Sequence, residues 1–488
     1  MIFIMPKPVF TEEKNGEFVF SDKLYFIIDK KFSNQEFLEF CPVLFKNFTV
    51  GKTKLEIVKS DKLVNNAVIS LSKDVEITEK ITEYEYELVV DNNGISFAYS
   101  EDNGLVHGFV SLLQMISSYR RKTNDFTVPF AQIKDRPALE LRGMHLCVFH
   151  GLSLNIIKKY VILCGLLKCS HILLEFWGSL KYDSLTVLGW SDAYSKEDFK
   201  EIIQYGKAFG MEFIPFFNHL GHAPQSRSAT GKHTVLSQAP EYEEWFKLGG
   251  WTWNIENEDV VNLQKNVRGE LCEMFGKGEF FHIGCDEFAD HFRLFADNDE
   301  DESRVFVNFL NDTCRDIKNT NNRKTMMWGD MFLDKKDFPW PFCGNTNDDF
   351  CYGHDGLDDE MYVIDWQYNI KEDKTESVDY FLKFKDPSKL ILAPWTTKDG
   401  IKGRCNIAKK YKLFGVIGTT WNKVFENPSD MMYTAICMWD DDDKPYKDDY
   451  SLNVYTKIMM MNYLRKILPE TDYETAGILK TDLFDVKM

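Results

Sequence analysis

From about residue 136 onward, the chain repeats one pattern: a short apolar run, a polar break, and a longer segment in which apolar residues recur every three or four positions. Short apolar runs between polar breaks predict buried strands, and the longer periodic segments predict amphipathic helices. The predicted strands are Leu141–Val148, His171–Trp177, Glu212–Asn218, Glu279–Asp286, Lys324–Trp328, Met361–Trp366, Lys389–Pro394 and Phe414–Trp421. The predicted helices are Leu154–Cys164, Lys196–Phe209, Asp259–Phe275, Glu302–Lys318 and Val378–Lys385. Eight strands that alternate with helices favour a (β/α)8 TIM barrel over residues 136–488.

The first 135 residues follow a different pattern, in which short β-branched or aromatic runs alternate with polar breaks. The clearest runs are Leu24–Ile28, Ala67–Leu71 and Tyr86–Val90, and a helical pattern follows over Leu105–Met115. A small α/β domain over residues 1–135 is therefore expected, and a length of 488 residues fits two domains. Because a barrel of this type has about 250 residues, long loops are also expected, one of them at Asp334–Asp359.

The composition is that of a packed globular protein, with 44% apolar and 15% aromatic residues. A net charge of −18 disfavours nucleic acid and anionic membranes as partners, because both attract basic surfaces. The apolar start Met1–Met5 is too short for a signal peptide, and no apolar stretch of about 20 residues follows. The 11 cysteines show no C-x-x-C spacing, which favours free thiols. We therefore predict a cytoplasmic protein.

The octet from Phe280 to Glu287, FFHIGCDE, carries the strongest chemical signal. An apolar strand ends there in two adjacent carboxylates, and the C-terminal strand ends of such barrels form the active-site face. Alternation along a strand directs His282, Gly284 and Asp286 to the barrel interior, and Glu287 begins the loop. Two carboxyl groups, one protonated and one ionised, are the groups that cleave glycosidic bonds.

This octet resembles the His-x-Gly-Gly-Asp-Glu signature of family-20 glycoside hydrolases, the β-N-acetylhexosaminidases, with Cys285 in place of the second Gly. Asp135-Arg136-Pro137 is similar to the start of that family's barrel, and Ile214-Pro215 through Gly221-His222-Ala223 is similar to its third strand. The ordered resemblance covers roughly residues 1–470. It implies an exo-acting enzyme that needs no cofactor and hydrolyses terminal β-linked GlcNAc or GalNAc.

The resemblance also implies a substrate-assisted, retaining mechanism, an exception to the scheme with a carboxylate nucleophile. The substrate's own acetamido oxygen attacks C1 and forms an oxazoline. Glu287 would be the general acid and then the base that activates water. Asp286 would orient the acetamido N–H and stabilise the developing positive charge.

Other residues match the family in order. His222 falls at the place of a supporting histidine, and Asn218 and His282 are expected to hold the two carboxylates through hydrogen bonds, although a core histidine is an equal interpretation for His282 and His219. Trp328, Trp366 and Trp421 match the aromatic cage around the sugar. For Trp395 and Trp177, sugar binding and core packing remain open.

The chain departs from the family in its sugar contacts. Cys147 and His150 stand where the family has Asp and a hydroxyl-binding Arg, so His150 is the candidate for that contact. The family's Tyr after strand seven has no match, and Tyr368 is its candidate replacement. The family's Trp-x-Glu is Trp421-Asn422-Lys423 here. Preference between GlcNAc and GalNAc therefore stays open.

Two other functions compete with this interpretation. A non-catalytic sugar-binding relative is disfavoured by the retained Asp286-Glu287 pair. A metal-dependent barrel hydrolase is raised by several histidines near the barrel mouth: His145, His150, His219, His222 and His282. No H-x-H or H-E-x-x-H spacing occurs, so no metal site is predicted. The acidic run Asp440–Asp443 lacks the spacing of a calcium loop and reads as a solvated turn.

Overall fold

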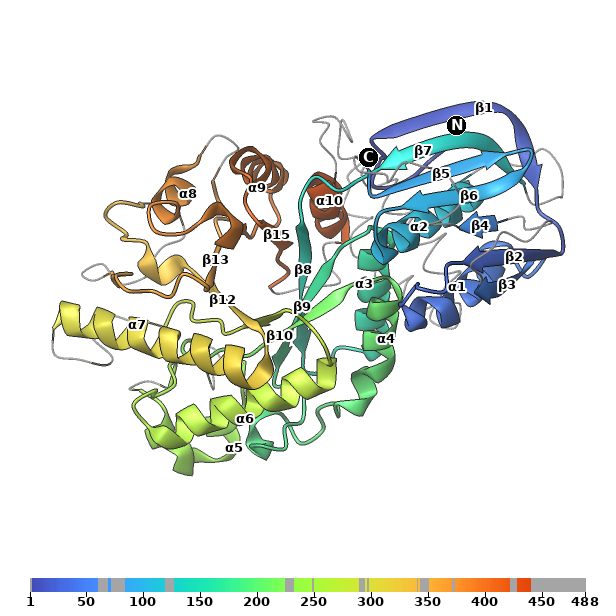
Figure 1. Ribbon diagram of the computed structural model, residues 1–488. Coiled ribbons are helices and arrows are strands. Elements are labelled where there is room, and N and C mark those ends of the chain that lie inside the picture. The colour runs from blue at the N-terminus through green and yellow to red at the C-terminus, as the bar shows by residue number, and fades with distance from the viewer. Residues whose placement is uncertain are drawn as a thin grey trace, which may run out of the picture.

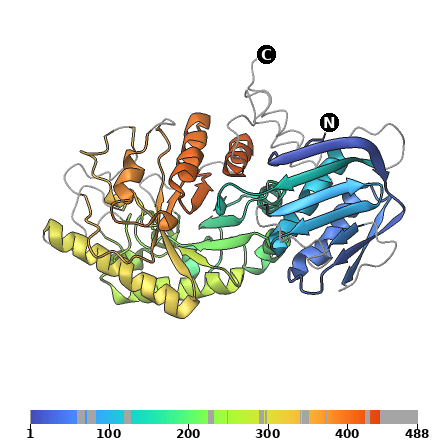
Figure 2. The same ribbon diagram turned by 45° about the horizontal axis from the view of Figure 1, so that its top comes forward.

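The computed structural model describes residues 2–59, 69–71, 84–118, 127–223, 232–247, 250–288, 295, 298–339, 341–342, 351–370, 374–421 and 428–439. The chain forms a small N-terminal domain and a closed barrel that lie side by side (Figures 1 and 2). The Asp440–Asp443 run lies outside the described residues. No helix in the described part of the chain is long and apolar enough to cross a membrane.

The N-terminal domain is a seven-stranded mixed sheet with two helices on one face. Its strands follow the order β1-β7-β5-β6-β4-β2-β3. The ring centroids of Phe26 on β2 and Phe109 on α2 lie 5.6 Å apart, and those of Phe37 on α1 and Phe109 lie 5.4 Å apart. Both helices therefore share one apolar core with the sheet. The elements are β1 (Phe10–Val19), β2 (Lys23–Ile28), α1 (Gln35–Phe48), β3 (Lys54–Lys59), β4 (Ile69–Leu71), β5 (Tyr86–Asp91), β6 (Gly94–Tyr99), α2 (Asp102–Ser118) and β7 (Thr127–Asp135).

The second domain confirms the predicted (β/α)8 barrel. Its eight parallel strands close in the order β10-β11-β12-β13-β14-β15-β8-β9. The strands are β8 (Leu141–Phe149), β9 (His171–Trp177), β10 (Glu212–Phe216), β11 (Phe280–His282), β12 (Lys324–Trp328), β13 (Tyr362–Asp365), β14 (Leu390–Leu392) and β15 (Gly415–Gly418). The helices are α3 (Leu154–Leu166), α4 (Lys200–Ala208), α5 (Val235–Gln238), α6 (Glu258–Phe275), α7 (Asp299–Asp316), α8 (Glu376–Phe381), α9 (Lys398–Tyr411) and α10 (Pro428–Trp439). The short helical turns are η1 (Thr186–Leu188), η2 (Glu197–Phe199), η3 (Pro240–Trp245), η4 (Ile317–Asn321), η5 (Asp330–Phe332) and η6 (Pro387–Lys389).

The predicted elements are present, with differences at their ends. β9 and β12 have the predicted bounds, whereas β11 ends at His282 rather than Asp286 because the backbone bends sharply from Gly284 onward. The described part of Asp334–Asp359 contains no helix or strand, as expected of a long loop. Helices α9 and α10 were not predicted: α9 is polar and has two glycines, and α10 is apolar on every side. The predicted division at residue 135 falls between β7 and β8.

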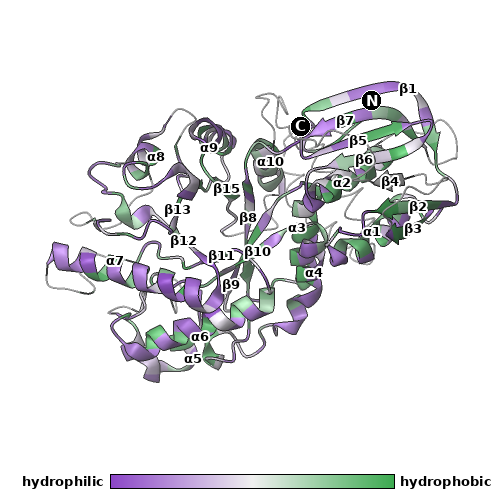
Figure 3. Cartoon of the chain, viewed as in Figure 1, coloured by the Kyte–Doolittle hydropathy of each residue, from purple (hydrophilic) through white to green (hydrophobic). Residues whose placement is uncertain are grey.

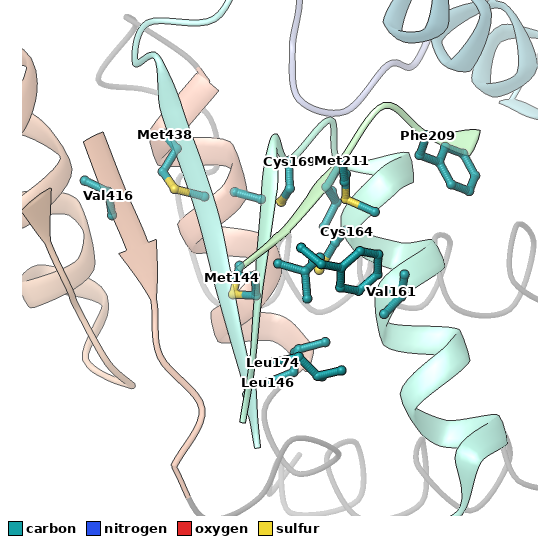
Figure 4. Packing of buried hydrophobic residues seen from close by; sticks show 14 of the residues in the cluster. Met144, Leu146, Val161, Cys164, Cys169, Leu174, Phe209, Met211, Val416 and Met438 are labelled. Carbon is teal, nitrogen blue, oxygen red and sulfur yellow. The ribbon is translucent and has the colours of Figure 1, made fainter. Parts of the chain in front are cut away.

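Two apolar cores hold the barrel. One fills its interior with side chains from alternate strand positions, including Leu173, Ile214 and Ile417. The other lies between strands and helices, where Met144 and Leu146 of β8 and Leu174 of β9 face α3 (Figure 4). Helix α7 carries hydrophilic residues over most of its surface, as expected for an outer helix (Figure 3). This scaffold presents the C-terminal ends of the strands at one rim.

A buried polar network joins the two domains. The Lys168 ammonium, which follows α3, lies 2.8 Å from Asp135 Oδ2 at the end of β7 and 2.8 Å from the Tyr86 hydroxyl on β5. The indole of Trp439 on α10 donates to Asp135 Oδ1 at 3.0 Å. Lys168 and Asp135 have no exposed side-chain surface, so this interface excludes water. Lys168 precedes β9 and Asp135 precedes β8, so the network lies where the strands begin, at the barrel end opposite the paired carboxylates.

Candidate active site

The backbone after β11 is bent in an unusual way. Gly284, Cys285 and Glu287 all have positive φ, at 69°, 69° and 46°. Glycine is required at 284, because a Cβ there would lie 2.2 Å from Asn218 Oδ1. Cys285 and Glu287 adopt a conformation that costs an L-residue about 1–2 kcal/mol. Strained backbone of this kind concentrates at functional sites.

Asp286 is the buried member of the carboxylate pair, with 5% of its surface exposed. Its Oδ1 accepts a hydrogen bond from Asn218 Nδ2 at 3.2 Å, and its Oδ2 lies 3.2 Å from His222 Nε2. Burial opposes ionisation, but the positive charges of Lys232 and His222 hold the pKa of Asp286 well below its usual range. Asp286 is therefore ionised at neutral pH.

Glu287 is the open member of the pair, with 37% of its side chain exposed. Its Oε2 also lies 3.2 Å from His222 Nε2, so one imidazole faces both carboxylates. Its backbone is fixed on both sides: the N–H donates to Asp330 Oδ2 at 3.0 Å, and the carbonyl accepts from Trp251 Nε1 at 2.6 Å. The left-handed bend and these two hydrogen bonds thus fix the Glu287 backbone while its side chain stays partly exposed to solvent.

His222 lies beside the Trp251 ring, at 4.3 Å between centroids. Burial opposes its charge, but the Asp286 carboxylate raises the pKa of His222 above its ordinary value. The structure thus places Asn218 and His222 against the carboxylates, as expected. His282 contacts neither of them among the described residues: its Nδ1 accepts from the Gly284 N–H at 3.0 Å, and burial lowers its pKa to about 3. Its neutral ring supports the bend.

Asp330 is a third carboxyl group at the site and was not predicted from the sequence. Its Oδ1 accepts from Trp366 Nε1 at 2.9 Å while its Oδ2 accepts from Glu287, so it joins the bend to the aromatic wall. Burial, together with the charges of Asp286 and Glu287, raises the pKa of Asp330 to about 8. Its place just after a barrel strand was the available signal, because Asp330 opens the helical turn η5 two positions after β12 ends.

An aromatic wall stands beside the carboxylates. The Trp366 and Tyr368 rings lie 5.1 Å apart, Tyr368 and Trp395 lie 5.4 Å apart, and the Trp421 indole donates to the Tyr368 hydroxyl. Trp366, Trp395 and Trp421 are half-buried, so part of each side chain is exposed to solvent. Trp328 is completely buried, with its centroid 5.5 Å from that of Trp421. In this structure it supports the wall from below.

A buried polar cluster forms the floor of the site and was also not predicted. Lys232 Nζ lies 2.7 Å from Glu175 Oε1, and His145 Nε2 lies 2.8 Å from Glu175 Oε2. Cys147, at the family's Asp position, lies 3.6 Å from the same Oε2. Burial opposes the Glu175 charge, but Lys232 and His145 lower its pKa to about 2. Glu175 on β9 and Cys147 on β8 are register partners, which brings their side chains together.

His150 lies apart from this centre, whereas the Trp177 ring lies 5.3 Å from Lys232 Nζ in the floor of the site. The His150 side chain is 39% exposed and its Nε2 lies 2.8 Å from Asp192 Oδ1, so among the described residues it is paired with a loop carboxylate rather than with the site. Trp177 is half-buried, with its centroid 4.9 Å from that of Phe149. His219 is a core histidine whose Nδ1 lies 2.7 Å from the Phe217 carbonyl.

One group of side chains has the spacing of metal ligands. Potential donor atoms of His145, Cys147 and Glu175 all lie within 4.8 Å of one another. However, the Lys232 ammonium already lies 2.7 Å from Glu175, and burial raises the pKa of the Cys147 thiol well above its usual range. A cation here would meet a fixed positive charge and a protonated thiol. The donor set therefore fits a hydrogen-bonded cluster better than a metal.

Two sequence models of one family match the chain. "Glycosyl hydrolase family 20, catalytic domain" matches residues 170–436, and "Glycosyl hydrolase family 20, domain 2" matches residues 1–136. A β-hexosaminidase of Porphyromonas gingivalis is 26% identical over 317 residues, which are 59% of this chain and 39% of that protein. The chitooligosaccharidolytic β-N-acetylglucosaminidase of Bombyx mori is 23% identical over 323 residues, 64% of this chain and 49% of the relative. The chain thus spans less than half the length of these relatives.

Solved structures of similar shape cover nearly the whole chain. A β-N-acetylhexosaminidase from Bacteroides fragilis superimposes with a TM-score of 0.67 at 17% identity, over 94% of this chain and 95% of that chain. A mutant β-hexosaminidase of Streptomyces plicatus in complex with GlcNAc gives a TM-score of 0.65 at 15% identity, over 97% of this chain and 95% of that chain. At these identities the likeness shows the fold.

Proposed function

Because the chain belongs to glycosyl hydrolase family 20, we propose that it is a glycosidase that removes terminal β-linked N-acetylhexosamine from glycans. The observation that carries this proposal is the pair at the end of β11. Asp286 is buried and ionised, Glu287 is partly exposed to solvent, and His222 Nε2 lies 3.2 Å from both. One fixed anion beside one accessible carboxyl group is the arrangement that acetamido-assisted cleavage requires.

In the first step, the acetamido carbonyl oxygen of the substrate attacks C1 as the bond from C1 to the leaving oxygen breaks. Glu287 donates its proton to that leaving oxygen, so the aglycone departs as an alcohol. The Asp286 carboxylate accepts the acetamido N–H and balances the positive charge of the oxazolinium ring. No covalent bond to the protein forms.

In the second step, Glu287 removes a proton from water as the water oxygen attacks C1. The bond between C1 and the acetamido oxygen breaks, the acetamido group is restored, and Glu287 is protonated again. Two displacements at C1 retain the β-configuration. The aromatic wall of Trp366, Tyr368, Trp395 and Trp421 supports this proposal because sugar rings pack their C–H faces on aromatic side chains.

A panel of aryl β-glycosides tests the proposal. We expect turnover of the GlcNAc or GalNAc glycosides and none of the Glc and Gal glycosides, because only the former carry the attacking acetamido group. A thiazoline analogue of the oxazoline should inhibit competitively. Comparable rates on GlcNAc and Glc glycosides would contradict the acetamido mechanism.

The same panel separates the competing functions. A non-catalytic sugar-binding relative, which the loss of the family's Arg at His150 favours, would bind these glycosides without cleaving them. A metal-dependent hydrolase that uses His145, Cys147 and Glu175 would lose activity with EDTA and regain it with zinc. We expect turnover that chelators leave unchanged.

A further inference from the structure

We propose that Lys232, held against Glu175 in the floor of the site, is a positioning residue that supplies the positive counter-charge to Asp286. The inference rests on the proposed function, in which Asp286 acts on the substrate as an anion. It assigns a role to a buried cluster that neither the two carboxylates nor the aromatic wall explains. Lys232 is 1% exposed and Glu175 is 3% exposed, so both charges lie out of water.

Ring contacts fix the position of the ammonium group. Lys232 Nζ lies 5.3 Å from the Trp177 ring on β9, 5.3 Å from the Phe216 ring on β10 and 5.2 Å from the Trp421 ring after β15. These rings come from three strands of the same arc β15-β8-β9-β10, so they hold the ammonium against that side of the barrel mouth. Phe216 pairs with His282 across β10 and β11, so the ammonium lies beside the strand that leads to Asp286.

Charge balance gives the reason for a lysine there. A buried carboxylate is costly unless an opposite charge compensates it. Glu175 Oε2 lies within hydrogen-bond distance of His145 Nε2 while its Oε1 forms an ion pair with Lys232, so the ammonium is not the only partner of Glu175. Burial opposes the Lys232 charge, yet Asp286 and then Glu175 raise its pKa above the ordinary value. Lys232 therefore serves both carboxylates.

The other groups around Asp286 do not replace this charge. Besides Lys232, the titratable groups near enough to interact with Asp286 electrostatically are His222, Glu287, Asp330, His282 and Cys285. Of these, only His222 can be positive, and it is shared with Glu287. Its charge falls away as pH rises, whereas the lysine stays charged. Lys232 is the permanent cation at this site within the described residues.

A double-mutant cycle on unfolding tests the inference without any assay of activity. Lys232→Met and Asp286→Asn are compared singly and together by denaturant titration at pH 7. The denaturant midpoint of the double variant should fall by clearly less than the sum of the two single decreases. The reason is that the interaction between the two charges can be lost only once. If Lys232→Met does not fold, Lys232→Gln takes its place in the cycle.

Lys168→Met is the matched control, because Lys168 is also a fully buried lysine, 2.8 Å from a carboxylate, but at the other barrel end. Combined with Asp286→Asn, it should be additive. An additive cycle for Lys232 as well would overturn the inference.

The pH dependence of kcat/KM on an activated aryl N-acetylhexosaminide gives the second measurement. Asp286 must be ionised, and without Lys232 its burial raises its pKa, so the acidic limb should move to higher pH by about 1–2 units. Lys168→Met should leave the limb in place. An unmoved limb in Lys232→Met would overturn the inference while wild-type turnover still upheld the proposed function. If the double-mutant cycle showed coupling but the wild-type protein did not cleave the glycoside, only the proposed function would be contradicted.

Discussion

Asp286 and Glu287 are neighbours in sequence but lie in different surroundings, and this difference sets their roles. Glu287→Gln removes the proton that the leaving oxygen needs. On a substrate whose leaving group is a sugar alcohol we expect a loss of about 10²–10⁴-fold in kcat/KM. The loss should be much smaller on a nitrophenyl glycoside, because nitrophenolate leaves without being protonated. Steady-state kinetics on a series of leaving groups of different pKa measures this.

Asp286→Asn is the comparison for that series. It removes a charge that acts on the acetamido group, so every leaving group should suffer to a similar extent. If the graded response appeared in Asp286→Asn and a uniform loss in Glu287→Gln, the two roles would be reversed.

Asp330 gives a prediction about pH and stability. Its pKa is raised to about 8 in the folded state from an ordinary value of 3.8, so the folded protein holds a proton that the unfolded chain releases. Stability from this group is full below pH 4 and is lost as pH rises toward 8. Asp330→Asn should therefore flatten the decline in unfolding free energy over that range by about 1 kcal/mol per pH unit.

Denaturant titrations across pH 4–9 measure the slope for Asp330→Asn. Asp355→Asn is the control, because Asp355 is a fully exposed carboxylate. Equal slopes for wild type and Asp330→Asn would show that Asp330 is ionised throughout.

At the scale of elements, the bend after β11 makes a separate prediction. Cys285 is completely buried and has a φ of 69°, which glycine adopts without cost. We expect Cys285→Gly to fold and keep its activity. Cys285→Val should lose at least about 2 kcal/mol of stability, because a β-branched residue fits this conformation poorly, and should lose activity as Glu287 shifts.

Unfolding midpoints and kcat/KM check this prediction. Cys314→Val is the matched control, since Cys314 is a buried thiol in the regular helix α7, and it should cost far less. A Cys285→Val variant as stable and active as Cys314→Val would mean that the bend tolerates a side chain of this kind.

The sequence predicted elements more readily than it predicted the site. The bounds of β9 and β12 were predicted correctly at both ends. An apolar run between polar breaks depends only on residues that are adjacent in the chain, so it can be recognised in the sequence. The exposed edge strand β1 has no such run and was missed. Lys232 and Asp330 were missed for another reason: their roles come from residues 57 and 43 positions away, Glu175 and Glu287, which only the closed barrel brings near.

At the scale of the whole molecule, the two barrel ends have separate tasks. The site occupies the rim where strands end, and the Lys168–Asp135–Trp439 network ties the N-terminal sheet to the rim where strands begin. In barrels of this class the first rim carries catalysis and the second carries stability. A change at the second rim should therefore alter stability without altering the chemistry.

Lys168→Met tests this separation. It leaves the buried Asp135 carboxylate without its cation, so we expect a loss of about 3–5 kcal/mol in unfolding free energy, with kcat/KM unchanged at temperatures where the variant is folded.

Lys200→Met is the control: Lys200 pairs with Glu197 at 2.9 Å, but their side chains are 63% and 76% exposed, and such surface pairs contribute at most about 1 kcal/mol. Denaturant titration and kinetics on the same preparations give both quantities. Equal losses for the two variants would mean that the network does not hold the domains together, and a fall in kcat/KM for folded Lys168→Met would mean that the two rims are coupled.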